Sequence, residues 1–171
     1  MRPDAHGLTL LPFWAGERSP GWSADARGAL LGLSLDTRPI EVLRAAMEAV
    51  AVRVAEIDRL LRHSEPREEE ILATGGALLH SPAWLQIMAD VLGRPVQVSA
   101  VSEGSSRGAA LLGLERLGHL DVPLEQLPAP IGRTFDPDPA HREAYLALAE
   151  RQRQAYDLLV ANRNAPHRLD A

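Results

Sequence analysis

Two adjacent glycines between an apolar run and a helical pattern are the residues best suited to bind a ligand. Thr74-Gly75-Gly76-Ala77 follows the apolar residues 71–73, and His80 comes shortly afterwards. Glycine has no β-carbon, so such a turn lets a flat ligand approach the backbone closely, and a following helix can place free N–H groups near an anion. A tight strand-to-helix turn without a ligand fits the same residues. The turn lacks the GxGxxG pattern of dinucleotide sites and their later acidic residue.

The dipeptide Glu17-Arg18 is a second candidate, in a loop rich in Gly, Pro, Ser and Asp between residues 15 and 27. A guanidinium group suits carboxylates and phosphates, so the pair is a candidate substrate clamp. A surface ion pair is the simpler alternative. Glu17 and Asp25 also form a possible carboxylate pair, although nothing in the sequence fixes their geometry. Ser105-Ser106-Arg107-Gly108 fits either a ligand-binding helix start or close packing of a helix on a sheet.

The composition excludes several other kinds of site. The chain contains no cysteine, which excludes disulfides, thiolate nucleophiles and thiolate metal ligands. All 18 basic residues are arginine, so neither a Walker-type lysine nor a Schiff-base lysine is present. The six histidines are scattered and form no helical two-histidine motif, so we expect no metal site.

The size and charge of the chain limit its class. Its 171 residues suit one domain of ordinary size. A net charge of -5 gives no basic excess that would favour nucleic acid or an anionic membrane surface. The apolar runs are far shorter than a membrane span, and the N-terminus lacks the apolar stretch of a signal peptide. We therefore expect a cytoplasmic protein.

The elements that would position these residues alternate between strands and helices, which indicates at least one parallel crossover pair. Residues 8–14 and 28–35 are apolar runs that can pair antiparallel across a wide loop. Pro39 opens a long helix with Thr37 as a candidate cap. We expect helices over residues 39 to about 63, 81–92, 107–117 and 139 to about 161, the third of them capped by Ser105 or Ser106. Strands are expected near 71–74 and 96–98, and irregular structure over 118–136.

Four motifs in order resemble the C-terminal domain of the FGGY carbohydrate kinases, over about residues 8 to 118. LPFWAGERSPGW, starting at Leu11, resembles the family's LPFLxGERxPxW, and GALLGL with the later Glu41-Val42 and AAME fits its second signature. ATGGA with SPAWLQIMADVLG resembles its adenosine-binding turn and helix, and EGSSRGAA resembles EASARGAA. The GERSPGW wording is most similar to the gluconate-kinase branch.

The resemblance implies an α/β chain with an actin-like ATPase, ribonuclease H-like domain, truncated before its first strand. ATP would lie in the cleft between two such domains. Gly76 matches the family glycine whose backbone meets the adenosine, with Gly75 and Ala77 beside it. His80 falls where some members place an asparagine that contacts the nucleotide. The full enzyme would use Mg2+ and ATP to phosphorylate gluconate or a related sugar.

The same resemblance implies that catalytic residues lie elsewhere. In the family the aspartate base and first phosphate turn belong to the N-terminal domain, and this chain has no Asp-x-Gly-Thr turn. No catalytic residue is assigned here, and we expect the fragment alone to be inactive. A regulatory or scaffolding fragment of the same fold is the alternative.

The resemblance divides the chain into three parts. Residues 1–7 are a leader or truncation scar, residues 8–118 the partial kinase domain, and residues 119–171 an irregular segment and a C-terminal helix. In the implied fold the first strand lies between the second and the fourth. Its absence predicts that another segment fills the gap or that the sheet rearranges. The missing N-terminal kinase domain or a second copy, in a homo-oligomer, is the expected partner.

Overall fold

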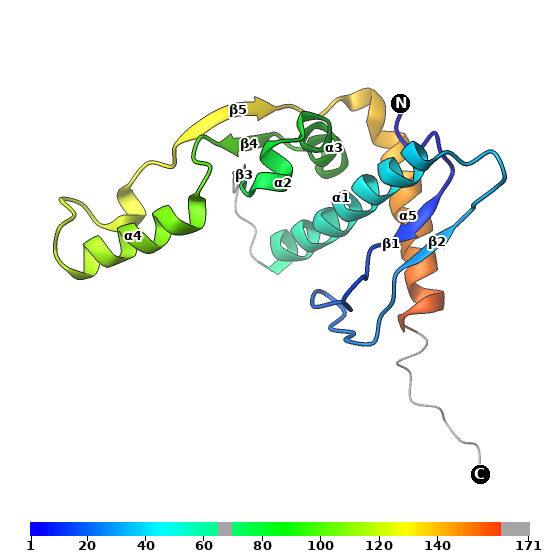
Figure 1. Cartoon of the computed structure of the whole chain (residues 1–171), viewed down its shortest axis with the longest axis horizontal. Coiled ribbons are helices and arrows are strands. Elements are labelled where there is room, and N and C mark those ends of the chain that lie inside the picture. The colour runs from blue at the N-terminus through cyan, green and yellow to red at the C-terminus, as the bar shows by residue number, and fades with distance from the viewer. Residues whose placement is uncertain (65–69, 162–171) are drawn as a thin grey trace, which may run out of the picture.

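The strands of the computed structural model, which describes residues 1–64 and 70–161, lie in two separate sheets (Figure 1). In the smaller sheet, β1 (Thr9–Leu11) pairs antiparallel with β2 (Ala29–Leu31), as predicted. In the larger sheet, with strand order β3-β4-β5, β4 (Val96–Ser99) pairs parallel with β3 (Ile71–Ala73) and antiparallel with β5 (Ile131–Phe135). The described strands therefore do not form one continuous sheet.

The helices carry most of the packing. They are α1 (Pro39–Ser64), α2 (Gly76–Leu79), α3 (Pro82–Leu92), α4 (Gly104–Arg116) and α5 (Arg142–Leu159), with short 3-10 turns η1 (Leu124–Gln126) and η2 (Pro139–His141). Figure 1 shows α1 running between the two sheets, and α4 standing at the far end of the molecule. Within the described residues, no helix is long and apolar enough to cross a membrane.

Local chemistry explains where the helices begin and end. Pro39 occupies the first turn of α1, and the carboxylate of Glu41 accepts the backbone N–H of Arg38 at 2.8 Å. The hydroxyl of Thr37 accepts the N–H of Ser34 instead, so the prediction that Thr37 caps α1 was wrong. α3 has the predicted proline at its first position, and Gly93 ends it with a φ of 64°.

Two sequence-based boundaries differ from the structure. The predicted irregular stretch 118–136 contains β5, which completes one side of the larger sheet. Helix α4 begins at Gly104 rather than Arg107, and no side chain caps it, so the predicted caps Ser105 and Ser106 lie inside the helix. Pairing with β4, rather than local propensity, makes residues 131–135 a strand.

Two apolar cores hold the elements together. The larger core joins α1 and α3 to the larger sheet and to α5 through buried side chains such as Val52, Leu85, Ile87, Val96 and Leu148. The smaller core joins the β1–β2 hairpin to the end of α5 through Leu11, Phe13, Ala26, Ala155 and Val160. Because α5 contributes to both cores, it fixes the hairpin relative to the larger sheet.

Candidate functional site

The glycine turn lies on the surface directly after β3, with its backbone open to solvent. Ala73 is buried, whereas Thr74, Gly75, Gly76 and Ala77 are all exposed. Gly75 has a φ of 94°, a conformation that only glycine adopts without strain. A β-carbon on Gly75 would meet nothing within 4 Å, and one on Gly76 would approach only the His80 ring, at 3.8 Å. The rest of the protein therefore leaves this backbone accessible to a ligand.

His80 folds back onto the turn. Its Nδ1 lies 2.7 Å from the carbonyl oxygen of Gly76, which also accepts the backbone N–H of His80 at 3.0 Å. Since a carbonyl only accepts, Nδ1 carries the proton of this bond, and Nε2 of the neutral ring keeps its lone pair. The ring is exposed, and Nε2 has no hydrogen-bond partner among the described residues. The structure thus places a hydrogen-bond acceptor beside the glycine backbone.

The turn has little helix behind it. α2 has only four residues, and the helix expected from Ser81 starts as the separate α3. Ser81 caps α3, with its hydroxyl accepting the N–H of Trp84. The indole of Trp84 in turn donates to the carbonyl of Met47 at 3.1 Å, which anchors α3 to α1. The turn is therefore better suited to a flat, uncharged group than to a phosphate.

The two residues of the second candidate pair lie in different environments, because Glu17 is buried and Arg18 is exposed. The carboxylate of Glu17 is buried and accepts bonds from Arg53 Nη2, at 2.5 Å, and from the Tyr156 hydroxyl, at 2.6 Å. The Arg53 guanidinium also lies over the rings of Phe13 and Tyr156, at 5.4 and 4.9 Å. Glu17 therefore anchors the loop. Arg18 is exposed and has no ion pair among the described residues.

The Glu17 anchor also changes the chemistry of Tyr156. Burial, and the hydrogen bond to the Glu17 carboxylate, raise the pKa of the Tyr156 phenol to about 12. Neither Arg53 nor Tyr156 was singled out from the sequence. Both sit on amphipathic helices where an arginine or a tyrosine looks ordinary, so no local signal identifies them.

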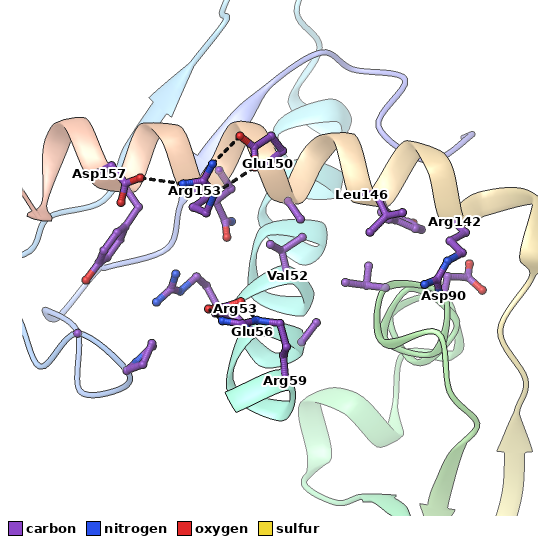
Figure 2. Close-up of a pocket in the computed structure, with 18 residues that line it drawn as sticks. Val52, Arg53, Glu56, Arg59, Asp90, Arg142, Leu146, Glu150, Arg153 and Asp157 are labelled. Atoms are coloured by element: carbon purple, nitrogen blue, oxygen red, sulfur yellow. Dashed lines mark hydrogen bonds and ion pairs between the residues drawn. The ribbon is translucent and has the colours of Figure 1, made fainter. Parts of the chain in front are cut away.

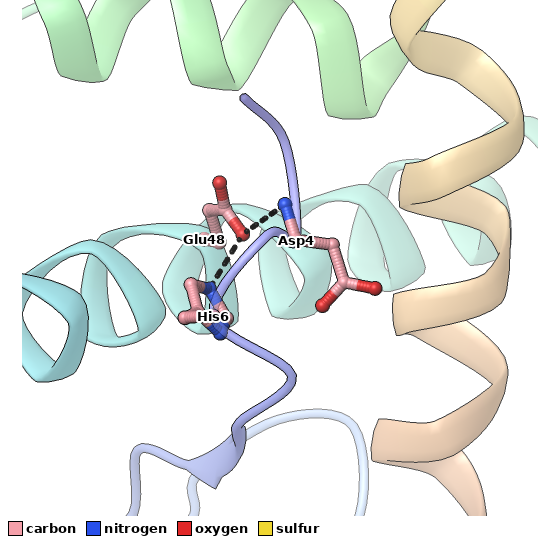
Figure 3. A group of neighbouring side chains, drawn as sticks. All are labelled: Asp4, His6 and Glu48. Carbon is pink, nitrogen blue, oxygen red and sulfur yellow. Dashed lines mark hydrogen bonds and ion pairs between the residues drawn. The ribbon is translucent and has the colours of Figure 1, made fainter. Parts of the chain in front are cut away.

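A third polar cluster ties the N-terminal residues to α1 (Figure 3). Glu48 is fully buried, and its carboxylate contacts His6 Nε2 at 3.0 Å, the Asp4 backbone N–H at 3.3 Å, Arg44 Nε at 2.5 Å and the Tyr145 hydroxyl at 3.3 Å. Burial opposes ionisation of Glu48, but the bonds from His6 and Arg44 prevail and lower its pKa.

Asp4, His6 and Glu48 are the one group with metal-site spacing in the part of the chain that the structure describes. His6 Nδ1 accepts the backbone N–H of Leu8 at 2.9 Å, so Nε2 holds the proton that it shares with Glu48. The carboxylate of Asp4 pairs with Arg151 at 2.6 Å. The lone pairs that would bind a metal are therefore already engaged in a structural cluster.

A groove of about 610 Å³ is lined by residues of α1, α3 and α5 (Figure 2). Val52, Val91 and Ala149 give it apolar walls, while charges of both signs line its rim. Arg153, for example, bridges Glu150 and Asp157. No residue of the glycine turn lines the groove. Glu17 is bonded to Tyr156 of α5, whereas the glycine turn follows β3 in the larger sheet, so the structure does not bring the two candidates together.

Comparison with known proteins places this geometry in a family. The C-terminal domain of the FGGY family of carbohydrate kinases matches residues 2–115. The chain is 33% identical to a gluconokinase of Bacillus subtilis over 145 residues, which are 84% of this chain and 28% of that protein. It is 31% identical to a ribulokinase of Bacillus licheniformis over 170 residues, 95% of this chain and 31% of that protein.

A solved structure has the same fold. The xylulose kinase of Rhodospirillum rubrum superposes with a TM-score of 0.74 at 32% identity, covering 91% of this chain and 31% of that one. The chain thus spans less than a third of the length of these relatives. These likenesses confirm the predicted α/β, actin-like ATPase fold. The chain belongs to the FGGY family of carbohydrate kinases, and it corresponds to their C-terminal domain.

Proposed function

We propose that this chain is the nucleotide-binding C-terminal part of an ATP-dependent kinase that phosphorylates gluconate or a related sugar in the cytoplasm. The observation that carries the proposal is the open backbone of Gly75 and Gly76. Nothing among the described residues requires Gly76 to lack a side chain, because a β-carbon there would meet only His80, at ordinary contact distance. A ligand that lies against this backbone supplies the reason.

The adenosine of ATP fits this surface in shape and polarity. A purine ring is flat, and it would rest on the exposed backbone of Gly75, Gly76 and Ala77. The exposed Nε2 of His80 would accept a hydrogen bond from an amino group or a hydroxyl of the nucleoside. Because α2 is too short to stabilise an anion, the phosphates and Mg2+ would be held mainly by another part of the enzyme.

The sugar would contact this chain through the loop between β1 and β2. Arg18 in that loop is exposed and forms no ion pair with any described residue, and its guanidinium suits the carboxylate of a sugar acid. Glu17 holds that loop in place by accepting hydrogen bonds from Arg53 and Tyr156. Neither residue is a catalytic base, and we assign none to the described residues. The chain by itself should not turn over sugar.

A chimera tests this function. The chain alone, assayed with Mg-ATP and gluconate in a coupled assay, should show no turnover. Placed in the Bacillus subtilis gluconokinase instead of the part it matches, it should support gluconate phosphorylation. Gly76→Val should reduce that activity at least tenfold. Gly113→Val should not, because a β-carbon on this glycine of α4 would meet nothing within 4 Å. A folded chimera indifferent to Gly76→Val would contradict the nucleotide role, and turnover by the chain alone would contradict its dependence on a partner.

A further inference from the structure

The groove lined by α1, α3 and α5 has one end where unused hydrogen-bonding groups meet apolar walls. Figure 2 shows Arg53 at this end and Arg142 at the opposite end. The walls near Arg53 come from α1, α5 and the loop between β1 and β2. A volume of about 610 Å³ is within the range of small-molecule pockets, which are mostly apolar with a few well-placed polar groups. The polar groups at this end therefore indicate what the groove can bind.

Gln152 offers the groove a hydrogen-bond acceptor. The residue lines the groove and is 1% exposed, and its Nε2 donates to the carbonyls of Leu10 at 3.0 Å and Ala49 at 3.1 Å. Because carbonyl oxygens only accept, this atom has to be the nitrogen, and the other atom of the amide is the oxygen. Oε1 accepts no hydrogen bond from a described residue, yet it is not among their fully enclosed atoms that lack a partner. It therefore faces the groove as a free acceptor.

Arg53 offers donors one helical turn away. Its Nη2 donates to Glu17, whereas Nε and Nη1 have no acceptor among the described residues. The guanidinium lies 4.9 Å from the centre of the Tyr156 ring, which holds it in place. Arg53 and Tyr156 each lie one turn beyond the contact between Gln152 and Ala49, on α1 and α5 respectively. Free donors and a free acceptor thus lie roughly 5–6 Å apart, the spacing of neighbouring turns.

The charges at this end favour an uncharged ligand. Glu17 balances the charge of Arg53, and on the rim Arg153 is paired with Glu150. A carboxylate in the groove would set a second oxygen against Oε1 of Gln152, with no proton between the two atoms. The arrangement instead matches a neutral group that has an acceptor and a donor side by side.

We propose that this end of the groove binds a planar, uncharged aromatic amide, either a primary carboxamide or a lactam. The carbonyl of the ligand would accept from Arg53, and its N–H would donate to Oε1 of Gln152. Hydrogen bonds of about 2.9 Å on the two sides of an amide bridge a gap of this size. The aromatic ring would lie against the apolar walls at Val52 and Ala149. No residue of the glycine turn lines the groove, so this site goes beyond the proposed function.

Three small probes of similar size test the proposal on the unmodified 171-residue chain. Benzamide has both the carbonyl and the N–H, acetophenone has the carbonyl alone, and benzoate has a negative charge and no N–H. Each is titrated into the ¹⁵N-labelled protein while NMR follows the side-chain amide of Gln152 and the Nε–H of Arg53. Benzamide should shift both signals and saturate with a dissociation constant on the order of 1 mM, as expected for so small a ligand. Acetophenone and benzoate should bind at least tenfold more weakly.

A matched pair of variants locates the binding. Ala149 lines the groove one turn before Gln152, whereas Ala147 is exposed on α5 and does not line the groove. Ala149→Leu should weaken benzamide binding at least tenfold because it fills the groove, and Ala147→Leu should leave it unchanged. Circular dichroism checks that both variants are folded. The proposal would be overturned by equal binding of the three probes, by no binding of benzamide to the unmodified chain, or by unchanged binding to folded Ala149→Leu.

Mg-ADP and gluconate separate this site from the sites of the proposed function. Neither should displace benzamide, because the glycine turn and Arg18 do not line the groove. Displacement by Mg-ADP would assign the groove to the nucleotide, and displacement by gluconate would assign it to the sugar. Either result would overturn the proposal of a separate amide site.

Discussion

At the scale of single residues, two buried carboxylates connect segments that are far apart in the sequence. Glu17 connects the loop after β1 to α1 and α5, and Glu48 connects the first residues of the chain to α1 and α5. A buried charge is costly unless it is paired and hydrogen-bonded, and both are. Removing a partner from either should therefore be more damaging than removing the same residue type at the surface.

Gly21 illustrates how tightly the Glu17 anchor is built. A β-carbon at this position would overlap the Tyr156 hydroxyl and the Glu17 carboxylate. Gly21→Ala should break the bond between them and destabilise the protein by about 1.5–3 kcal/mol, as expected for a hydrogen bond to a charged group. Gly104→Ala, where a β-carbon meets nothing within 4 Å, is the control. Urea unfolding of both variants measures the difference, and equal stability would show that the anchor is unimportant.

Tyr156 should report on Glu17 through its titration. Its pKa of about 12 lies above the ordinary value of 10 because of burial and the bond to Glu17. The chain has two tyrosines, and burial raises the pKa of Tyr145 even further, so absorbance at the phenolate band should show Tyr156 titrating before Tyr145. Glu17→Gln should lower the pKa of Tyr156. A raised pKa means that the folded state holds the proton longer, so this contribution to stability is lost as pH rises from 10 towards 12. A Tyr156 pKa unaffected by Glu17→Gln would contradict the assignment.

Glu48 should give the opposite dependence at acidic pH. Its folded pKa lies below the ordinary 4.5, since the bonds from His6 and Arg44 outweigh burial. Its contribution to stability is therefore present above pH 4.5 and is lost as pH falls through the folded pKa. Glu48→Gln should flatten the decline in unfolding free energy below pH 4.5. An unchanged decline, measured by urea unfolding at several pH values, would assign the acid sensitivity to other groups.

At the scale of elements, α5 is the helix on which the arrangement depends. It packs on β1 and α3, and Gln152 joins it to the carbonyls of both β1 and α1. This helix lies beyond the residues matched by the family domain, which end at 115. The C-terminal helix is therefore part of the same packed unit as the hairpin and α1.

Gln152→Leu should reveal this dependence. The side chain is 1% exposed, so the variant leaves the carbonyls of Leu10 and Ala49 without its amide in the interior. We expect a loss of about 1–3 kcal/mol in unfolding free energy. Gln154 lies two residues further along the helix and is exposed, so Gln154→Leu should lower the unfolding free energy much less. Thermal unfolding of the two variants decides the matter, and similar midpoints would mean that the buried amide contributes little.

The sequence predicts the strongly patterned elements and misses those that depend on partners. The apolar period of α1 and the Ser81-Pro82 start and Gly93 end of α3 identify those helices, because each signal is local. β5 was missed, since Gly132 and the flanking prolines indicate a loop and only pairing with β4 makes this stretch a strand. The glycine turn could be located from its motif. The burial of Glu17 could not, because Arg53 and Tyr156 are distant in sequence.

At the scale of the whole molecule, the hairpin and the helices α1, α3 and α5 are closely packed, whereas α4 has no buried residue. The apolar cores join α1, α3, α5 and both sheets. β3 and α4, by contrast, expose leucines, and no described strand pairs with the outer edge of β3. The glycine turn lies directly after β3, beside this edge of the larger sheet.

The most direct measurement is a calorimetric titration of Mg-ADP into the 171-residue chain and its Gly76→Val and Gly113→Val variants. We predict saturable binding to the chain and to Gly113→Val, and at least a tenfold loss of affinity in Gly76→Val. Circular dichroism should show that all three are equally folded. Binding that is equal in all three proteins would contradict the placement of adenosine at the glycine turn.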